Sequence, residues 1–401
     1  MKRPEAAPLK RNLGLGLLTM YGVGVMVGAG IYVLVGAVAA EAGIWAPLAF
    51  LMAGLVAAPS ALSYAELSSR IPEASGEAAF VEKGLNSHLL AVLIGLAIVV
   101  AGSVSAAAVL RGGVGYLTSI VDVPAAWAIV GFGVALAGVA AIGVLESLSL
   151  AALFTVVELL GLGAVIWAGF SAPTVADIAT LPPPYWPGVA GAAALAFFAF
   201  IGFEDIVNMA EETRDPTRIV PRAILISLVV TTALYALVAL AAIRVVPVDD
   251  LAASDQPLVL VWEAGFTTTP VVLGAIAVVA ALNGVLAQIV MAARVLFGLG
   301  RREPMLGLFY RAHPKFGTPV LATFLVGLAV IGAALALPVA DLAEVTSGVL
   351  LVVFAVVNIA LIALKRKAPD APFRTARWVP WVGLFAALVA LAASFLPTVV
   401  S

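Results

Sequence analysis

The chain has 401 residues, of which 63% are hydrophobic and only 11% charged, with a mean hydropathy of +1.15 and a net charge of −2. Since a soluble domain carries about a quarter charged residues and about half apolar ones, this composition excludes a water-soluble globular protein and indicates a chain solvated by a lipid bilayer. The chain contains no Cys and two His, which excludes disulfides and thiolate metal sites and argues against an enzyme, a bound cofactor or a nucleic-acid partner.

Eleven apolar stretches are long enough to cross a hydrocarbon core of about 30 Å. The first is too long for a cleavable signal peptide, so it is expected to remain as a span. The eleven predicted spanning helices are 13–40, 45–65, 88–119, 125–145, 149–170, 188–211, 222–244, 269–299, 319–337, 341–364 and 379–397. The sequence therefore predicts an all-α polytopic membrane protein that forms a single domain over residues 1–401.

Basic residues give the orientation, because Lys and Arg are enriched in the cytoplasmic loops of membrane proteins. With the N-terminus inside, the inner segments hold 18 of the 21 Lys and Arg residues. These inner segments are the N-terminal tail, 66–87, 212–222, 300–318 and 365–378. We therefore expect a multi-pass protein of the plasma (inner) membrane with a cytoplasmic N-terminus and, because the span number is odd, an extracellular or periplasmic C-terminus.

Three segments outside the spans mix polar and apolar residues: 66–87, 248–266 and 300–316. Such a mixture is typical of a helix that lies along the membrane surface. A plain solvated loop is an equally good interpretation of each.

The first span is interrupted by glycine near its middle, at Gly28-Ala29-Gly30. Each glycine costs about 1 kcal/mol against alanine inside a helix, so a dense group of them favours a break. A close helix contact is the alternative, since Gly24 and Gly28 have the spacing of a small-xxx-small motif.

The sixth span repeats the pattern. Gly202 lies near its middle and is followed at once by Phe203, Glu204 and Asp205. Charged side chains at membrane depth are costly and usually functional.

Spans one and six would be corresponding members of a five-plus-five inverted repeat, and matched interruptions in two halves indicate the binding site of a secondary transporter. Amide N–H groups freed at the start of the second half-helix suit a carboxylate. Carbonyls freed at the end of the first half-helix suit an ammonium group. The pattern therefore predicts a site that holds a zwitterion with backbone atoms alone.

Five ordered motifs resemble those of the amino acid–polyamine–organocation (APC) superfamily over about residues 12–380. The resemblance implies a LeuT-like transporter of amino acids or amines that works by alternating access, with a first repeat at about 13–170, a second at about 188–364 and an extra helix at about 379–397. The motifs are Gly28-Ala-Gly-Ile-Tyr32, Leu62 to Pro72, Gly143-Val-Leu-Glu-Ser147, Phe197 to Ile224 and Lys365 to Arg374.

The resemblance also implies roles for single residues near the breaks. The substrate carboxylate would meet the amides of Gly28, Ala29 and Gly30. The substrate amine would meet the carbonyls of Met26, Phe198 and Ile201, beside Gly202. Phe198 takes the place of an aromatic ring that closes over bound substrate in the superfamily. The alternative interpretation is that Phe198 is an ordinary lipid-facing or core residue.

Glu158, in the fifth span, takes the position at which several proton-coupled relatives carry Lys. Burial favours the protonated form of a carboxyl, so Glu158 could bind the coupling proton and donate to a freed carbonyl of the first span. It could instead hold Na⁺ or a substrate ammonium as a carboxylate, or make a structural hydrogen bond. Asn283 and Gln288, near the middle of the eighth span, are candidate polar linings, because the resemblance implies that this span contributes to the coupling site. Interhelical hydrogen bonding is an equally good interpretation of both.

Glu204 and Asp205 point about 100° apart on a helix, so one is expected to face the pathway and the other to pack elsewhere. The resemblance favours Glu204 as a pathway or gating residue. Asp205 could bias selectivity toward cationic substrates. The alternative is that neighbouring helices satisfy both carboxylates.

The main prediction is a proton-coupled amino acid symporter, with H⁺ as the expected coupling ion and Na⁺ as an open alternative. An amine, polyamine or amino acid exchanger on the same fold is the rival. The short loops and termini argue against a nutrient sensor, and the lack of a charged ring or filter motif argues against a channel. The sequence does not fix the oligomeric state.

Overall fold

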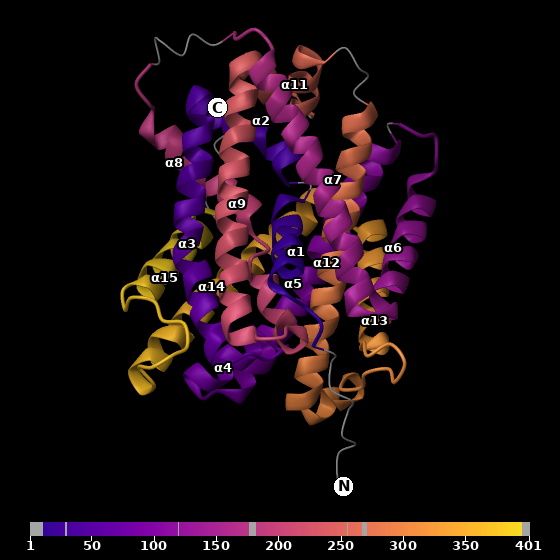
Figure 1. Ribbon diagram of the computed structural model, residues 1–401, viewed down its shortest axis with the longest axis vertical. Coiled ribbons are helices and arrows are strands. Elements are labelled where there is room, and N and C mark those ends of the chain that lie inside the picture. Colours follow the sequence, from indigo (N-terminus) through magenta and orange to yellow (C-terminus); the bar gives the residue numbers. More distant parts are fainter. Residues whose placement is uncertain are drawn as a thin grey trace.

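The computed structural model describes residues 11–28, 30–118, 120–175, 182–254, 256–266 and 271–394. Within these ranges the chain is helical, and the single β pairing is an isolated bridge between Leu13 and Thr213. Most helices run along the long axis of one bundle (Figure 1). The prediction of an all-α polytopic protein is confirmed.

Each of the eleven predicted spans contains a helix. The bundle is built from α1 (Leu15–Val27), α2 (Gly30–Ala42), α3 (Ala46–Arg70), α4 (Glu77–Leu85), α5 (His88–Thr118), α6 (Ala125–Ile142), α7 (Val144–Ser171), α8 (Trp186–Phe197), α9 (Pro216–Val245), α10 (Val248–Ala253), α11 (Pro257–Gly265), α12 (Val271–Arg302), α13 (Val320–Ala336), α14 (Val339–Lys367) and α15 (Val379–Ser394). In the part of the chain that the structure describes, they are connected by the 3₁₀ segments η1 (Gly43–Trp45), η3 (Phe198–Phe200), η4 (Glu204–Glu212) and η5 (Pro304–Phe309).

Among the described residues, nine helical segments are long and apolar enough to cross a membrane. Two further apolar helices, Val320–Ala336 and Val379–Ala392, are shorter. They coincide with the ninth and eleventh predicted spans.

The helices present large apolar side chains outward and keep polar ones inside. Leu55, Trp127 and Leu160 are each about 70% exposed, whereas Glu158 and Arg294 are fully buried. A lipid environment explains this distribution, because lipid solvates apolar surface and every polar group must then find its partner within the protein.

Small residues let the helices approach closely. A Cβ on Gly113 of α5 would touch Ala281 of α12, and a Cβ on Gly54 of α3 would touch Thr232 of α9. These contacts belong to the two most extensive helix pairs, α5 with α12 and α3 with α9. Close packing of small residues is the usual basis of helix association in membranes.

The interrupted first span lies in the middle of the bundle. Figure 1 shows α1 between α9 on one side and α7 and α12 on the other, and α1 packs against all three. α2 continues it and packs against α8 and α10. The first span is therefore in contact with the second broken span and with the helices that line it.

One end of the bundle carries α4, η5 and the start of α1 (Figure 1). We call it the basic end, because the ion-paired residues Arg70, Lys83, Arg302 and Lys365 lie there. α10 and α11 lie at the opposite end.

The segments of mixed polarity take up three different positions. α4 buries Ala78, Phe80 and Val81, so it packs into the protein and neither lies on the surface nor forms a solvated loop. α10 and α11 bury only one side each, through Leu251 and Leu258. In contrast, η5 leaves Met305 91% exposed.

Two of the five motifs form one structural unit at the basic end. The buried carboxylate of Glu66 on α3 pairs with Arg70 and with Lys365 of α14, each at 2.6 Å. It also accepts from the amide and hydroxyl of Thr375, at 2.8 and 2.7 Å. Charged groups that are fully paired can stay buried, so this carboxylate fastens α3 to the α14–α15 connection.

Candidate functional site

The first span breaks where the sequence predicts. α1 ends at Val27, and α2 begins at Gly30. Gly28 caps α1 with φ 14° and ψ −162°, and its N–H donates to the carbonyl of Gly24 at 3.3 Å. Ala29 lies outside the described residues.

The sixth span breaks at Gly202. α8 passes into η3, Ile201 is extended (φ −61°, ψ 132°), and η4 begins at Glu204. Gly202 has φ +129°, a conformation that residues with a Cβ rarely adopt. The glycine is therefore required by the break itself.

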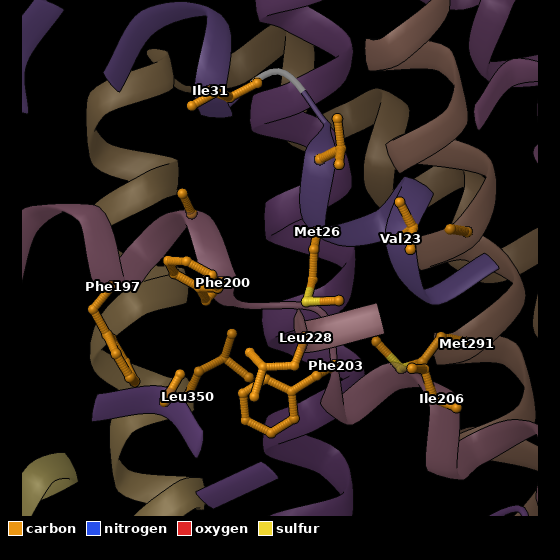
Figure 2. Close-up of a cluster of buried hydrophobic side chains, with 14 of the residues drawn as sticks. Val23, Met26, Ile31, Phe197, Phe200, Phe203, Ile206, Leu228, Met291 and Leu350 are labelled. Carbon is orange, nitrogen blue, oxygen red and sulfur yellow. The ribbon is translucent and has the colours of Figure 1, made fainter. Parts of the chain in front are cut away.

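The two breaks lie against each other. A Cβ on Gly202 would lie 2.8 Å from Cγ1 of Val25 and 3.2 Å from the amide nitrogen of Met26. A Cβ on Gly30 would lie 3.9 Å from Cα of Ala199. Figure 2 shows Met26 and Phe203, one from each broken span, pointing into the same apolar cluster beside Leu228.

One hydroxyl group connects the breaks. Oη of Tyr235 on α9 lies 2.5 Å from the carbonyl oxygen of Met26 and 3.0 Å from that of Ala199. The ring is fully buried and packs edge-on against Phe50 and Phe200. The single hydroxyl hydrogen of Tyr235 is thus within reach of a carbonyl in each first half-helix.

Several backbone groups predicted to bind substrate have protein partners in this conformation. The carbonyl of Phe198 accepts from the amide of Ile201 at 3.2 Å. The amide of Gly202 donates to Oε2 of Glu204 at 2.8 Å. The ring of Phe198 is partly buried at the edge of the core. A ligand at the breaks would have to replace some of these partners.

Glu158 lies in a polar cluster formed by three helices. Its Oε1 accepts from Nδ2 of Asn283 on α12 at 2.9 Å, and the same nitrogen lies 3.0 Å from Oγ1 of Thr155. That hydroxyl donates toward the carbonyl of Met20 on α1 at 3.2 Å. The structure therefore brings Glu158, Asn283 and the first span together, as the sequence predicts.

Two features make this cluster tight and incomplete. A Cβ on Gly24 would collide with Thr155 and Asn283, so α1 packs closely against α7 and α12 at this glycine. Oε2 of Glu158 is buried and has no hydrogen-bond partner among the described residues. An unpartnered carboxyl oxygen at this depth is costly and leaves room for a proton or a cation.

Glu204 and Asp205 have different neighbours, as their spacing predicts. Glu204 folds back onto the amide of Gly202, while Asp205 accepts from Nε2 of Gln288 on α12 at 2.6 Å. Both are buried. Neither carboxylate points freely into an open pathway in this conformation, and their gating and selectivity roles stay predictions.

The basic end is closed by backbone and charge. Leu13 donates to the carbonyl of Glu212 at 3.0 Å and accepts from the amide of Arg214 at 3.1 Å. Glu212 also forms a buried ion pair with Arg294 of α12, at 3.3 Å. The segment before α1 is therefore fastened to the end of η4.

Two hollows lie away from the breaks. A cleft of about 600 Å³ at the end opposite the basic end is lined by Val246, Asp250 and Glu263, among others. A smaller one borders Tyr32 and Ala277. The cleft contains none of the predicted site residues, so its size alone does not make it the binding site.

Sequence reasoning missed Tyr235 and the Glu212–Arg294 pair. A single tyrosine in the apolar half of a 30-residue helix was the available signal for the first. Arg294 and Glu212 each fall near the end of a predicted span. Among the described residues, no group of three His, Asp or Glu side chains is arranged to hold a metal ion.

Comparisons with known proteins show which proteins this chain is similar to. The sequence profile of the family described as amino acid permease matches residues 13–401. A branched-chain amino acid permease of Bacillus subtilis is 30% identical over 402 residues, which cover 91% of this chain and 83% of that protein. A methylthioribose transporter of the same species is 30% identical over 411 residues, covering 96% and 88%.

A chloroplastic cationic amino acid transporter of Arabidopsis thaliana is more distant. It is 29% identical over 332 residues, which cover 76% of this chain and 58% of that protein. The three names share transport and differ in what is transported.

Proposed function

Since the chain belongs to the amino acid permease family, and is thus a membrane transporter and not an enzyme, we propose that it carries neutral amino acids by alternating access. The observation that supports this most is the contact between the two breaks, where Gly202 meets the backbone of Val25 and Met26. Broken helices at corresponding places in two halves are typical of secondary-transporter sites.

The head group of the substrate would bind to the backbone of the breaks. Its carboxylate would take the amides around Gly28, Ala29 and Gly30, where the start of α2 offers N–H groups and positive dipole. Its ammonium group would take carbonyls among Met26, Phe198 and Ile201, in competition with Tyr235 and with the amide of Ile201.

The surroundings of the breaks favour an apolar substrate side chain. Figure 2 shows Val23, Met26, Phe200, Leu228 and Met291 around them. Asp205 is already bonded to Gln288 and Glu204 to Gly202, so neither is free for a cationic side chain. The similarity to the branched-chain amino acid permease supports the same choice.

Glu158 is the proposed coupling group, with H⁺ as the coupling ion. Its unpartnered Oε2 beside α1 could carry a proton that bonds to the first span, and deprotonation would remove that bond. Na⁺ held by the carboxylate is the alternative.

The basic end is the proposed cytoplasmic side of a plasma membrane, with the N-terminus inside, because Lys and Arg gather there. The C-terminus would then lie outside. Residues 1–401 would form one transporter domain, with repeats at about 13–170 and 188–364.

The test uses purified protein in liposomes. Radiolabelled leucine should exchange across the membrane at equal pH, and an imposed inward proton gradient should drive its accumulation. Glu158→Gln keeps an oxygen that accepts from Asn283, so exchange should persist while gradient-driven accumulation is lost. Glu146→Gln, on the exposed start of the same helix, is the matched control and should behave as the parent.

Three outcomes would contradict parts of the proposal. If Glu158→Gln still accumulates leucine under the proton gradient, Glu158 is not the coupling group. Exchange without any accumulation in the parent would favour an exchanger. Exchange of amines or polyamines but of no amino acid would overturn the substrate class.

A further inference from the structure

Two carboxyl groups at the basic end, four residues apart, have opposite surroundings. Glu73 receives a hydrogen bond from Lys83 at 2.8 Å and ion-pairs with Arg302 and, at 3.4 Å, with Arg301. Burial alone would raise its pKa, but these cations outweigh burial and hold the pKa below the ordinary value.

Glu77 has no such partners. It is the first residue of α4, its side chain is fully buried, and neither carboxyl oxygen has a hydrogen-bond partner among the described residues. An isolated buried carboxylate would be very costly. Burial, together with the charge of Glu204, raises the pKa of Glu77 to about 8.

Two other polar side chains beside Glu77 are also unpartnered. The amide of Asn208 on η4 faces the carboxyl of Glu77, but the geometry falls short of a hydrogen bond, and both its side-chain polar atoms lack a partner. Oη of Tyr64 on α3 lacks one too. Both residues are at most 1% exposed. Three different elements therefore contribute unused polar atoms to one buried place.

The charged groups of the surrounding elements do not neutralise Glu77. From η4 it meets only Glu204 and, further along, Asp205, which are acidic. His88 of α5 lies beside Glu82 and Glu303, and Lys365 and Lys367 of α14 reach Glu66 and the carbonyl of Gly84. On α12, Arg294 pairs with Glu212, and Arg302 pairs with Glu73 and Glu82.

The position of Glu77 connects the breaks with the basic end. The ring of Tyr64 packs edge-on against Phe203, which follows the second break, and against Phe80 of α4. Gly76 has φ +42°, and a Cβ added to it would collide with Oδ1 of Asn208, so α4 begins against η4. Five residues beyond Asn208, Thr213 pairs with Leu13 in the bridge that closes this end.

We propose that Glu77 is a second proton-binding site of the transporter, distinct from Glu158. The protonated carboxyl donates to Oδ1 of Asn208 and holds α4 on η4 while the basic end is closed. When the O–H bond breaks, the proton passes to cytoplasmic water. The carboxylate that remains must be hydrated, and water reaches it only when the basic end opens. This inference rests on the alternating access proposed above, but not on the identity of the substrate.

The direction of the pH effect follows from linkage. The pKa of Glu77 is about 8 in the closed state and returns toward its ordinary value of 4.5 once water reaches it. Proton binding at Glu77 therefore stabilises the closed state over the open state most strongly below pH 4.5. This stabilisation is lost as the pH rises through 8. Between these limits the ratio of open to closed protein should rise about tenfold per pH unit.

The experiment uses the absence of Cys from the chain. A single Thr213→Cys at the bridge reports opening of the basic end through its labelling rate with a membrane-impermeant maleimide. An Asp370→Cys protein, whose side-chain position is 98% exposed, corrects for the pH dependence of the thiol itself. The corrected rate should rise at least tenfold between pH 6 and pH 8.

Variants of Glu77 separate a proton site from a structural role. Glu77→Gln cannot release a proton, so the corrected rate should stay low at both pH values. Glu77→Asp keeps a titratable group and should restore the pH response if both variants elute as monodisperse protein. Glu82→Gln, on the exposed side of the same helix, should keep the response of the parent.

Each remaining outcome counts against the proposal. A pH response that survives in Glu77→Gln, or no response in the parent, would overturn it. So would a rate that changes with Na⁺ at constant pH and not with pH. The labelling requires no substrate, so failure to find a transported amino acid would not affect it, and leucine transport with pH-independent labelling would refute only the role of Glu77.

Discussion

The two broken spans are stabilised in different ways. The second break is supported from within its own span, since Glu204 caps the amide of Gly202. α1, before the first break, is held by neighbouring helices instead: Ser227 of α9 bonds to the carbonyl of Thr19, and Thr155 of α7 lies against that of Met20. Tyr235 does not distinguish the breaks, because it contacts a carbonyl in each.

This difference indicates which break is free to change. A cap within the same span moves with it, so the second break can keep its shape when surrounding helices shift. The hydrogen bonds of the first span cross to α7 and α9, and a movement of those helices must lengthen or replace them. We therefore expect the first span to respond most to coupling at Glu158.

The largest effect is expected from adding a methyl group at the second break. Gly202→Ala introduces a Cβ at φ +129° and 2.8 Å from Val25, and backbone strain of this kind costs about 1–3 kcal/mol before the clash is counted. Leucine exchange in liposomes should be lost. Gly163→Ala on α7, whose Cβ would have nothing within 4 Å, is the matched control and should remain active. Equal activity of the two would contradict the requirement for glycine at the second break.

Removal of the Tyr235 hydroxyl should have the next largest effect. Tyr235→Phe removes the donor that the carbonyls of Met26 and Ala199 share, one in each broken span, and a buried unsatisfied acceptor costs about 1–3 kcal/mol.

 The midpoint of thermal unfolding in detergent should fall by several degrees, and leucine exchange should fall with it. Tyr185→Phe, at an exposed ring, is the control for loss of a hydroxyl and should unfold as the parent does. An unchanged midpoint in Tyr235→Phe would show that this hydroxyl does not connect the breaks.

The cap at the second break should give the smallest effect. Glu204→Gln keeps an oxygen that can accept from Gly202, so its unfolding midpoint should stay close to that of the parent. Glu204→Ala removes the acceptor and should cost about 1 kcal/mol. If Glu204→Gln instead lowered transport as much as Glu204→Ala, the carboxyl would act through its charge, as expected of a pathway residue and not of a cap.

The breaks could be predicted from the sequence because their signal is local. Gly28, Gly30 and Gly202 disfavour a continuous helix wherever they occur in one, and the apolar runs around them fix their depth in the membrane. Glu158 and Asn283 could be placed together because the resemblance to a known superfamily gave the arrangement of their spans.

Contacts that depend on packing between distant elements could not be predicted. Tyr235 lies 209 residues from Met26 along the chain, and nothing near it in sequence indicates which carbonyls it meets. In the sequence, Glu77 has no feature that separates it from the other polar residues of its mixed segment, because its burial depends on the packing of α4 against η4. The link from Glu66 to Lys365 explains why two of the motifs occur together, although either motif alone gives no sign of it.

The most direct test of the central claim, that the breaks bind an amino acid, is the unfolding midpoint of the purified protein with increasing leucine. A ligand at one hundred times its Kd should stabilise the folded state by about 2.7 kcal/mol. We expect a concentration-dependent rise with leucine, a much smaller one with isoamylamine, which lacks the carboxylate, and none in Gly202→Ala. No rise with any zwitterionic amino acid, or an equal rise with isoamylamine, would contradict the account.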